Sequence, residues 1–261
     1  MRLVVLGVSV AALGLVARFG LGQPSPPPGY LTPATAPDTL KILPPAPKAG
    51  DADDEADQAI FRATRRLQGG ARWALAQNDA RDDAAAVLAD FSCAAGVALD
   101  PAKAPKLAAV LVRMRADVHH AVDAPKDFYH RPRPYLEADG PICVDKTEAL
   151  ATSADYPSGH ASWGWAVGLV LAELTPDRAT QILARARVYG ESRVVCGVHT
   201  PSAVVEGRTN GSIVVAALHG DPAFRADLEA ARSELSALRK DAAAPAAQCR
   251  VEAELVAARP W

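Results

Sequence analysis

Apolar residues recur at three- and four-residue spacing through most of the chain, in alanine-rich stretches that also carry leucine and valine. Alanine and leucine favour helices, and the alternation typical of strands is nearly absent. The pattern predicts helices over residues 55–76, 80–95, 102–124, 161–174, 176–189, 201–217 and 222–240. Because the apolar face of each helix needs a partner, we expect an all-α fold, a single-domain helical bundle of six or more helices.

Residues 1–22 carry a different pattern. An apolar run over residues 3–17 follows Arg2 and ends in a small-x-small motif at residues 20–22. This is typical of a secretory signal peptide cut after about residue 22. A membrane-spanning helix is the alternative, but Arg18 interrupts the run, which falls short of the roughly 20 apolar residues that a bilayer requires. Because no cysteine follows directly to carry a lipid, we expect a periplasmic or secreted protein without stable membrane insertion.

The rest of the chain divides into three parts. Proline blocks helices and crowds residues 23–50, so we expect a proline-rich N-terminal arm that lies on the domain. The helical domain covers residues 51–240, and residues 241–261 form a C-terminal tail that Cys249 could pin. At 261 residues and 49% hydrophobic content, the chain suits one domain with a sizeable core.

The charge balance excludes one class of partner. The formal net charge is -2, and it becomes -4 once residues 1–22, which hold two arginines and no acids, are removed. Such a chain predicts no basic surface, so we expect no nucleic acid partner. The sequence leaves a homo-oligomer open.

Three short clusters stand out between residues 126 and 199. They are Lys126-x6-Arg133-Pro134, Pro157-Ser158-Gly159-His160 and Ser192-Arg193-x5-His199. Phosphoryl transfer requires a protein to hold a group whose charge is spread over three oxygens. Arginine matches two of those oxygens at once, and lysine acts as a point charge. Since one histidine can attack and another can protonate the leaving oxygen, the clusters predict a phosphate site with a nucleophile and an acid.

Local signals indicate how the first cluster is presented. Two X-Pro bonds between Asp127 and Tyr135 favour an irregular loop. We expect this loop to turn Lys126 and Arg133 towards one centre, with Arg131 facing solvent. A solvated basic loop is the alternative interpretation of this cluster alone.

The other two clusters flank predicted helices. Ser158 to His160 directly precede an apolar helix, where exposed N–H groups bind oxyanions. Thr200-Pro201 has the pattern of an N-cap and first helical residue, which would hold His199 just outside a helix. A histidine in an N-terminal turn can instead serve as a cap or packing residue, but the occurrence of all three clusters in order favours one shared site.

Four cysteines sit far apart in an apparently exported chain, which favours two disulfides over a metal site. None of them forms a CxxC pair, so we expect no structural zinc. Spacing leaves three pairings open. We favour Cys143 with Cys196, because each lies in or near a cationic cluster that must converge on one phosphate, and Cys93 with Cys249 then follows.

In these motifs the sequence resembles the bacterial class A non-specific acid phosphatases, in the superfamily of type 2 phosphatidic acid phosphatases and vanadium haloperoxidases. The family signature is K-x6-RP, then PSGH, then SR-x5-H-x3-D, and the resemblance runs from about residue 30 to residue 217. It implies an all-α phosphoric monoester hydrolase that needs no metal and no cofactor and acts on small-molecule phosphate monoesters. It also implies His199 as the nucleophile that forms a phosphohistidine and His160 as the general acid. The phosphate-binding residues implied are Lys126, Arg133, Ser158, Gly159 and Arg193.

One position departs from this pattern. Four residues after His199 the family has an aspartate, and this chain has Ala203. Such a carboxylate would fix the histidine tautomer and stabilise its positive form, so its loss predicts impaired activity. Glu206 lies on the same helical face but further along the axis, where its reach is marginal. A backbone carbonyl or a water molecule could also orient His199.

Two other functions compete with a periplasmic acid phosphatase. A catalytically weak phosphate-binding homologue would keep the cations but lack a well-oriented nucleophile, and metal-free turnover separates it from an enzyme. A vanadate-dependent haloperoxidase would oxidise halide only with added vanadate. A lipid phosphatase is disfavoured because no membrane-spanning helices follow the apolar start.

Overall fold

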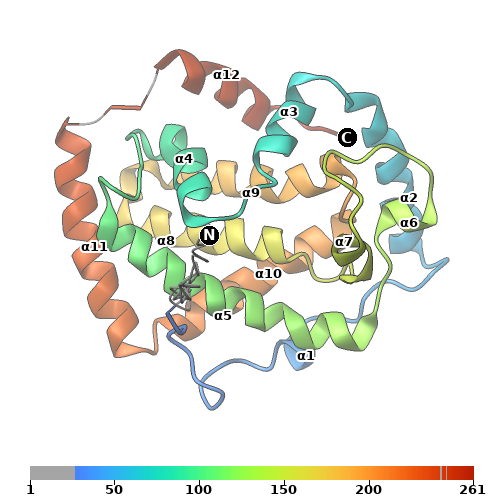
Figure 1. Ribbon diagram of the computed structural model, residues 1–261, viewed down its shortest axis with the longest axis horizontal. Helices are drawn as coiled ribbons and strands as arrows, with labels where there is room; N and C mark the ends of the chain where they lie inside the picture. Colours follow the sequence, from blue (N-terminus) through green and yellow to red (C-terminus); the bar gives the residue numbers. More distant parts are fainter. Residues whose placement is uncertain (1–26, 242, 245) are drawn as a thin grey trace, which may run out of the picture.

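The computed structural model describes residues 27–241, 243–244 and 246–261, and within these ranges the protein is all-α (Figure 1). The predicted fold class is therefore confirmed. The helices are α1 (Thr39–Ile42), α2 (Ala52–Thr64), α3 (Ala71–Asn78), α4 (Ala84–Ala95), α5 (Pro105–Tyr129), α6 (Pro134–Glu137), α7 (Glu148–Thr152), α8 (Gly159–Leu174), α9 (Ala179–Cys196), α10 (Pro201–Leu218), α11 (Pro222–Asp241) and α12 (Ala246–Ala257). Short 3-10 turns join α2 to α3 (Arg65–Leu67) and α8 to α9 (Pro176–Arg178).

Helix α8 is the centre of the bundle. It packs on α9 and α10 along most of its length and also contacts α5, as Figure 1 shows. Its side chains Trp163, Val167 and Leu171 are fully buried in the main apolar core. Because α8 is apolar on nearly every side, it can be covered by neighbours all round, which is the pattern of a core helix.

Glycines let two helices approach α8 closely. A Cβ atom on Gly164 of α8 would collide with the ring of Tyr189 on α9. A Cβ atom on Gly207 of α10 would lie 2.6 Å from the carbonyl oxygen of Ser158 at the start of α8. Since such contacts are too short for any side chain, these glycines set how near α9 and α10 come to the motif-bearing end of α8.

The three largest differences from the predicted helix boundaries are these. The predicted helix 55–76 is divided into α2 and α3, because the chain turns at Gly69, whose φ of 76° is left-handed. Helix α5 continues through Pro125 as far as Tyr129, beyond the predicted end at residue 124. Helix α9 runs to Cys196 rather than to residue 189, and Gly197 ends it with a φ of 80°.

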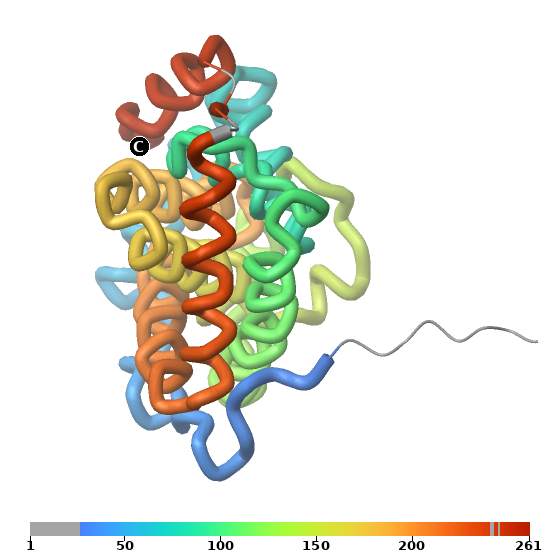
Figure 2. Tube along the Cα trace, turned by 90° about the vertical axis from the view of Figure 1, so that its left-hand side faces the viewer, coloured from blue at the N-terminus to red at the C-terminus, as the bar shows by residue number. Residues whose placement is uncertain are grey.

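The proline-rich arm lies against the bundle from residue 27 onward, at the end opposite to α12 (Figure 2). Tyr30 is buried, and its backbone N–H donates to the carboxylate of Asp117 on α5 at 2.8 Å. Further along the arm, the carbonyl oxygen of Pro44 accepts a hydrogen bond from the hydroxyl of Tyr156 at 2.7 Å. The arm thus reaches the segment that precedes α8.

Both disulfides have the favoured pairing, Cys143–Cys196 and Cys93–Cys249. The second one ties α12, a helix that the sequence pattern does not predict, to α4. The expected signal peptide, residues 1–22, lies outside the described residues. Within the described ranges, no helix has both the length and the apolar character needed to cross a membrane.

Candidate active site

The three sequence clusters meet at one end of the bundle. Lys126 lies in the last turn of α5, and Arg133 is the residue before α6. Ser158 caps α8, Arg193 lies in the last turn of α9, and His199 lies between α9 and α10. Helix termini from five segments therefore deliver the predicted side chains to one region.

The short connection between α9 and α10 fixes the position of His199. Gly197 ends α9, and the hydroxyl of Thr200 caps α10 by accepting from the N–H of Ala203 at 3.3 Å. The N–H of His199 donates to the carbonyl oxygen of Arg193 at 3.3 Å. The side chain of His199 is only 3% exposed, so its ring is held between two helix ends.

Both ring nitrogens of His199 have partners. Nη1 of Arg133 lies 3.0 Å from Nε2, and Oδ1 of Asp155 lies 2.8 Å from Nδ1. Because a guanidinium can only donate, Nε2 is the acceptor and carries the lone pair. Nδ1 therefore bears the hydrogen and donates it to Asp155, which leaves the lone pair of the ring on Nε2.

The surroundings keep His199 neutral. Burial is the largest cause that holds the pKa of His199 well below its ordinary value. Neighbouring positive charges lower this pKa further, and they come from Arg133, Lys126 and Arg193. A histidine that stays unprotonated in acid is able to attack an electrophile there.

Arg133 is held by backbone oxygens on two sides. Its Nε donates to the carbonyl oxygen of Ser153 at 2.7 Å, and its Nη1 donates to that of Val198 at 2.7 Å. Lys126 donates from Nζ to the carbonyl oxygen of Ala154. Burial, followed by the charge of Arg133, lowers the pKa of Lys126 to about 8. Arg133 is thus fixed against Nε2 of His199, and Lys126 is near enough for its charge to lower the pKa of His199.

Arg193 has unused hydrogen-bonding capacity. Its side chain is buried, and its Nε and Nη1 have no hydrogen-bond partner within the part of the chain that the structure describes. Burial lowers the pKa of Arg193 to about 10, so it remains charged at neutral and acid pH. A buried guanidinium with free donors favours an anion as its ligand, because an unpaired buried charge is costly.

The PSGH segment forms the start of α8. The side chain of Ser158 accepts from the N–H of Ala161 at 3.3 Å, and the nearest atom to a Cβ built on Gly159 would be Cγ2 of Val122 at 3.8 Å. A Cβ atom at Gly159 would therefore make only an ordinary contact, and N–H groups in the first turn of a helix suit an oxyanion. The structure shows Ser158 as a helix cap, so its hydroxyl has a role in the fold as well.

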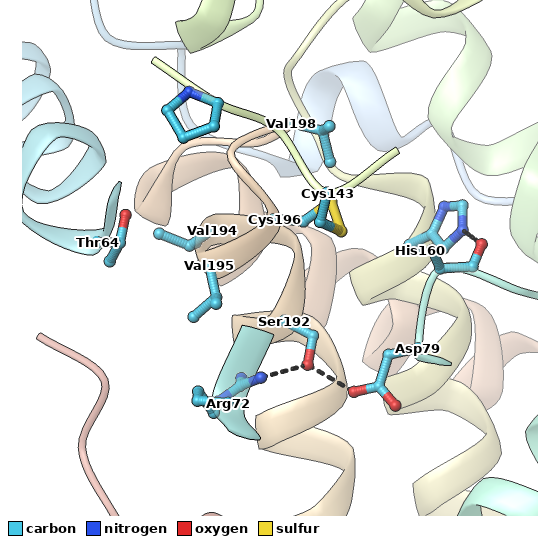
Figure 3. The surroundings of a disulfide bond; sticks show 12 residues. Thr64, Arg72, Asp79, Cys143, His160, Ser192, Val194, Val195, Cys196 and Val198 are labelled. Carbon is cyan, nitrogen blue, oxygen red and sulfur yellow. Dashed lines mark hydrogen bonds between the residues drawn. A yellow bond between two sulfur atoms is a disulfide. The ribbon is translucent and has the colours of Figure 1, made fainter. Parts of the chain in front are cut away.

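His160 lies near the same helix start and contacts a different loop. Its Nε2 is 3.1 Å from the carbonyl oxygen of Ala80, the contact drawn for His160 in Figure 3. Since a carbonyl only accepts, Nε2 bears the hydrogen and Nδ1 is the nitrogen that can exchange a proton. Burial, with the charge of Arg193, lowers the pKa of His160 to about 3.

A disulfide and a polar cluster brace this end of α9 (Figure 3). The Cys143–Cys196 bond joins the loop before α7 to the last residue of α9, and the N–H of Cys143 donates to the carbonyl oxygen of Cys196 at 3.0 Å. One turn earlier, the hydroxyl of Ser192 accepts from Arg72 at 2.9 Å and contacts Asp79. Ser192, the first residue of the third cluster, therefore connects α9 to Arg72 of α3 through a hydrogen bond.

Two local expectations were wrong. Lys126 lies in a helix rather than in a loop, because α5 tolerates Pro125 and ends only at His130, whose φ is 46°. Arg131 does not face solvent but is only 5% exposed. Its guanidinium contacts the carboxylates of Asp54 and Asp57, each at 2.9 Å.

The sequence did not single out Asp155 as a functional residue. It stands three residues before Ser158, is fully buried, and contacts a histidine 44 residues later in the chain. A signal was present, because a carboxylate beside one motif could replace the one missing at residue 203.

The described part of the chain holds no cluster of three or more His, Cys, Asp or Glu residues suited to a metal ion.

Comparison with known proteins places these motifs in a family. Residues 107–225 match the PAP2 superfamily. The chain is 44% identical over 209 residues to an acid phosphatase of Zymomonas mobilis, with 80% of this chain and 79% of the relative covered. It is 36% identical over 213 residues to a non-specific acid phosphatase of Providencia stuartii (81% and 86% covered), and 30% identical over 224 residues to one of Salmonella typhimurium (85% and 89% covered). The chain thus belongs to the bacterial class A non-specific acid phosphatases of the PAP2 superfamily.

Proposed function

We propose that this protein is an acid phosphatase that hydrolyses small phosphate monoesters through a phosphohistidine at His199. The observation that carries the proposal is the state of the His199 ring, which is neutral, has its lone pair on Nε2 and lies next to the guanidinium of Arg133. The relatives named as acid phosphatases support the reaction class.

In the first step, Nε2 of His199 attacks phosphorus in line with the ester oxygen. The nitrogen–phosphorus bond forms as the bond between phosphorus and the ester oxygen breaks. Charge on the non-bridging oxygens is stabilised by Arg133, Lys126 and Arg193, while the N–H groups at Gly159 and His160 and the hydroxyl of Ser158 contribute dipoles. Arg133 must move its donor from Nε2 to a phosphate oxygen during binding.

His160 supplies the proton for the leaving oxygen. Its Nε2–H stays on the carbonyl oxygen of Ala80, so Nδ1 takes up the proton that it later donates. The neighbouring charge of Arg193 lowers the pKa of His160, and an anion bound between them would oppose that effect. The substrate phosphate therefore helps to protonate its own general acid.

In the second step, water attacks the phosphohistidine. Neutral His160 accepts a proton from that water, the bond between phosphorus and Nε2 breaks, and inorganic phosphate leaves. His199 returns to its neutral form, and the proton count balances over the cycle. No step of this scheme uses a redox change or a metal ion.

The location of the enzyme forms part of the proposal. The apolar start at residues 1–22 and two disulfides among the described residues support export to the periplasm or secretion. There the enzyme would meet phosphate esters in an environment that can become acidic.

The direct test is hydrolysis of a chromogenic aryl phosphate over about pH 4 to 8 in the presence of a chelator. The native chain is compared with His199→Ala and with His120→Ala, whose exposed side chain makes a matched control. We expect activity in the native chain and the control, none in His199→Ala, and a labelled phosphate on His199 after quenching with alkali. Activity that persists in His199→Ala, or a native chain that hydrolyses no ester and oxidises halide once vanadate is added, would contradict the proposal.

A further inference from the structure

The carboxylate that the family pattern places at residue 203 has an equivalent elsewhere in this chain. We propose that Asp155, in the segment before α8, is the positioning residue that orients His199 for attack. This inference rests on the proposed phosphohistidine function and deepens it. It replaces the expectation of impaired activity that Ala203 suggests.

The contact between Asp155 and His199 has one consistent direction. Arg133 donates to Nε2, so the only ring hydrogen lies on Nδ1, and Oδ1 of Asp155 accepts it at 2.8 Å. This bond selects the tautomer whose lone pair faces the cations. When Nε2 bonds to phosphorus, the ring becomes positive, and the adjacent carboxylate stabilises that charge.

Asp155 is itself held on several sides. Its N–H donates to the carbonyl oxygen of Arg131 at 2.8 Å. Its Oδ1 accepts from the N–H of Thr200 at 3.1 Å, and its Oδ2 accepts from the Thr200 hydroxyl at 2.6 Å. Thr200 follows His199 directly, so a single residue aligns the carboxylate with the ring.

Arg131 is the nearest cation to Oδ2 of Asp155. Burial, the largest cause, holds the pKa of the Asp155 carboxyl above its ordinary value, and the hydrogen bonds from Thr200 and the charge of Arg131 oppose that rise. Nη1 of Arg131 lies 3.6 Å from Oδ2. The buried Arg131, which the sequence did not associate with the site, therefore has a function as the counter-ion of Asp155.

Residue 203 could not accept a carboxylate without rearrangement. Ala203 is fully buried and packs against Tyr156 and Ala46, and its carbonyl oxygen accepts from the N–H of Ser158 at 2.9 Å. The side chain of Tyr156, next to Asp155, contributes to the cover of the alanine. Ala203 and Asp155 are thus packed together through Tyr156, with the small side chain at residue 203 and the carboxylate at residue 155.

Glu206, the other carboxylate considered from the sequence, lies elsewhere. It borders a shallow surface pocket with Val205 and Pro45. Since Arg133 and Asp155 occupy both nitrogens of His199, no ring position is left for Glu206.

The test compares Asp155→Asn with Asp54→Asn and His199→Ala. Asparagine keeps the size of Asp155 but removes its charge. Asp54 contacts the same Arg131, which also has Asp57 as a partner, so Asp54→Asn controls for general damage to the ion-pair network. We expect Asp155→Asn to lower kcat by about 10³- to 10⁴-fold, by analogy with neutralised aspartates beside catalytic histidines. KM and the dissociation constant for inorganic phosphate should change little, because the cations that bind phosphate remain.

A structural effect alone would not produce that division between kcat and binding. A second readout is the proton NMR resonance of the Nδ1–H of His199, which we expect far downfield in the native chain and in Asp54→Asn but not in Asp155→Asn. An Asp155→Asn variant with kcat within threefold of the native value, or with the downfield resonance unchanged, overturns the inference while His199→Ala still tests the proposed function. If Asp155→Asn loses phosphate binding and activity in parallel, the inference is also overturned, because Asp155 would then have a structural role in the fold.

Discussion

Nη1 of Arg133 donates to Nε2 of His199 at 3.0 Å while it also donates to the carbonyl oxygen of Val198 at 2.7 Å. Nε2, the proposed nucleophile, is therefore covered by the same group that would hold the phosphate. Substrate binding has to exchange one acceptor of Arg133 for another. The free-energy cost of this exchange is small, because the guanidinium keeps the hydrogen bond from its Nε to the carbonyl oxygen of Ser153.

Arg133→Lys tests this exchange. A lysine has one charged nitrogen and cannot contact the two backbone oxygens and a phosphate oxygen in a fixed fork. We expect kcat/KM to fall by about 100-fold or more, since lost charge-assisted bonds of this type cost roughly 1.5–3 kcal/mol each. Steady-state kinetics with an aryl phosphate measure the loss.

Arg239→Lys is the matched control. Arg239 lies in α11, after the last motif in the chain, and forms an exposed ion pair with Asp177. Equal activity in the two lysine variants would show that the fork geometry of Arg133 is unimportant.

Lys126 should give phosphate binding a dependence on pH. Burial and the charge of Arg133 lower the pKa of Lys126 to about 8, so its ammonium loses its proton as the pH rises through that value. We expect the affinity for inorganic phosphate, measured by calorimetry, to weaken above about pH 8 in the native chain. In Lys126→Met the affinity for phosphate should be lower at every pH and should not change near pH 8. If the affinity of this variant still falls near pH 8, another group causes the pH dependence.

His160 should make the fold sensitive to acid. The pKa of His160 is lowered in the folded protein to about 3 from an ordinary value of 6.5, so between these values the unfolded chain binds more protons than the folded one. Stability linked to His160 is then present above about pH 6.5 and decreases as the pH falls towards 3.

We expect the Tm of the native chain to fall more between pH 6.5 and pH 4 than the Tm of His160→Asn. Inorganic phosphate should restore Tm at pH 4 in the native chain, since a bound anion favours protonated His160. Parallel Tm curves for the two proteins would show that His160 is not the acid-sensitive group.

Ala203→Asp, which restores the family pattern, should bring no benefit. His199 already donates to Asp155, and the new carboxylate would be buried against Tyr156 without a designed partner. We expect kcat to stay at or below the native value and stability to fall by about 3–5 kcal/mol, the range for an uncompensated buried charge. Denaturant unfolding and turnover measure both effects, and a clear gain in kcat would show that Asp155 orients His199 poorly.

The two disulfides should differ in their effect on activity. Cys143–Cys196 lies three residues from His199, whereas Cys93–Cys249 attaches α12 to α4. Replacing either pair by serine should cost about 2–5 kcal/mol of stability, because both close long loops. We expect kcat/KM at low temperature to fall at least severalfold only when the Cys143–Cys196 pair is replaced. If kcat/KM falls equally for both pairs, the loss reflects general destabilisation of the fold.

Much of this protein is determined by the sequence alone. Helical periodicity predicts the all-α bundle, since the apolar face of each helix must find a partner whatever the packing details. The three clusters predict a phosphate site, because together they hold three cations and two histidines, the groups that suit phosphoryl transfer. Spacing leaves three cysteine pairings open, and the expected convergence of the clusters favours Cys143 with Cys196, which is the pairing in the structure.

The tertiary structure decided how the ring of His199, the proposed nucleophile, is oriented. The bond between Asp155 and His199 joins the segment before α8 to the segment before α10, two helices that approach closely at Gly207. The burial of Arg131 depends likewise on α2, which supplies Asp54 and Asp57 from more than 70 residues away. Periodicity and spacing describe one segment at a time, whereas these contacts arise only when distant segments pack, so the sequence reveals a missing aspartate at residue 203 but not the one that lies against the ring.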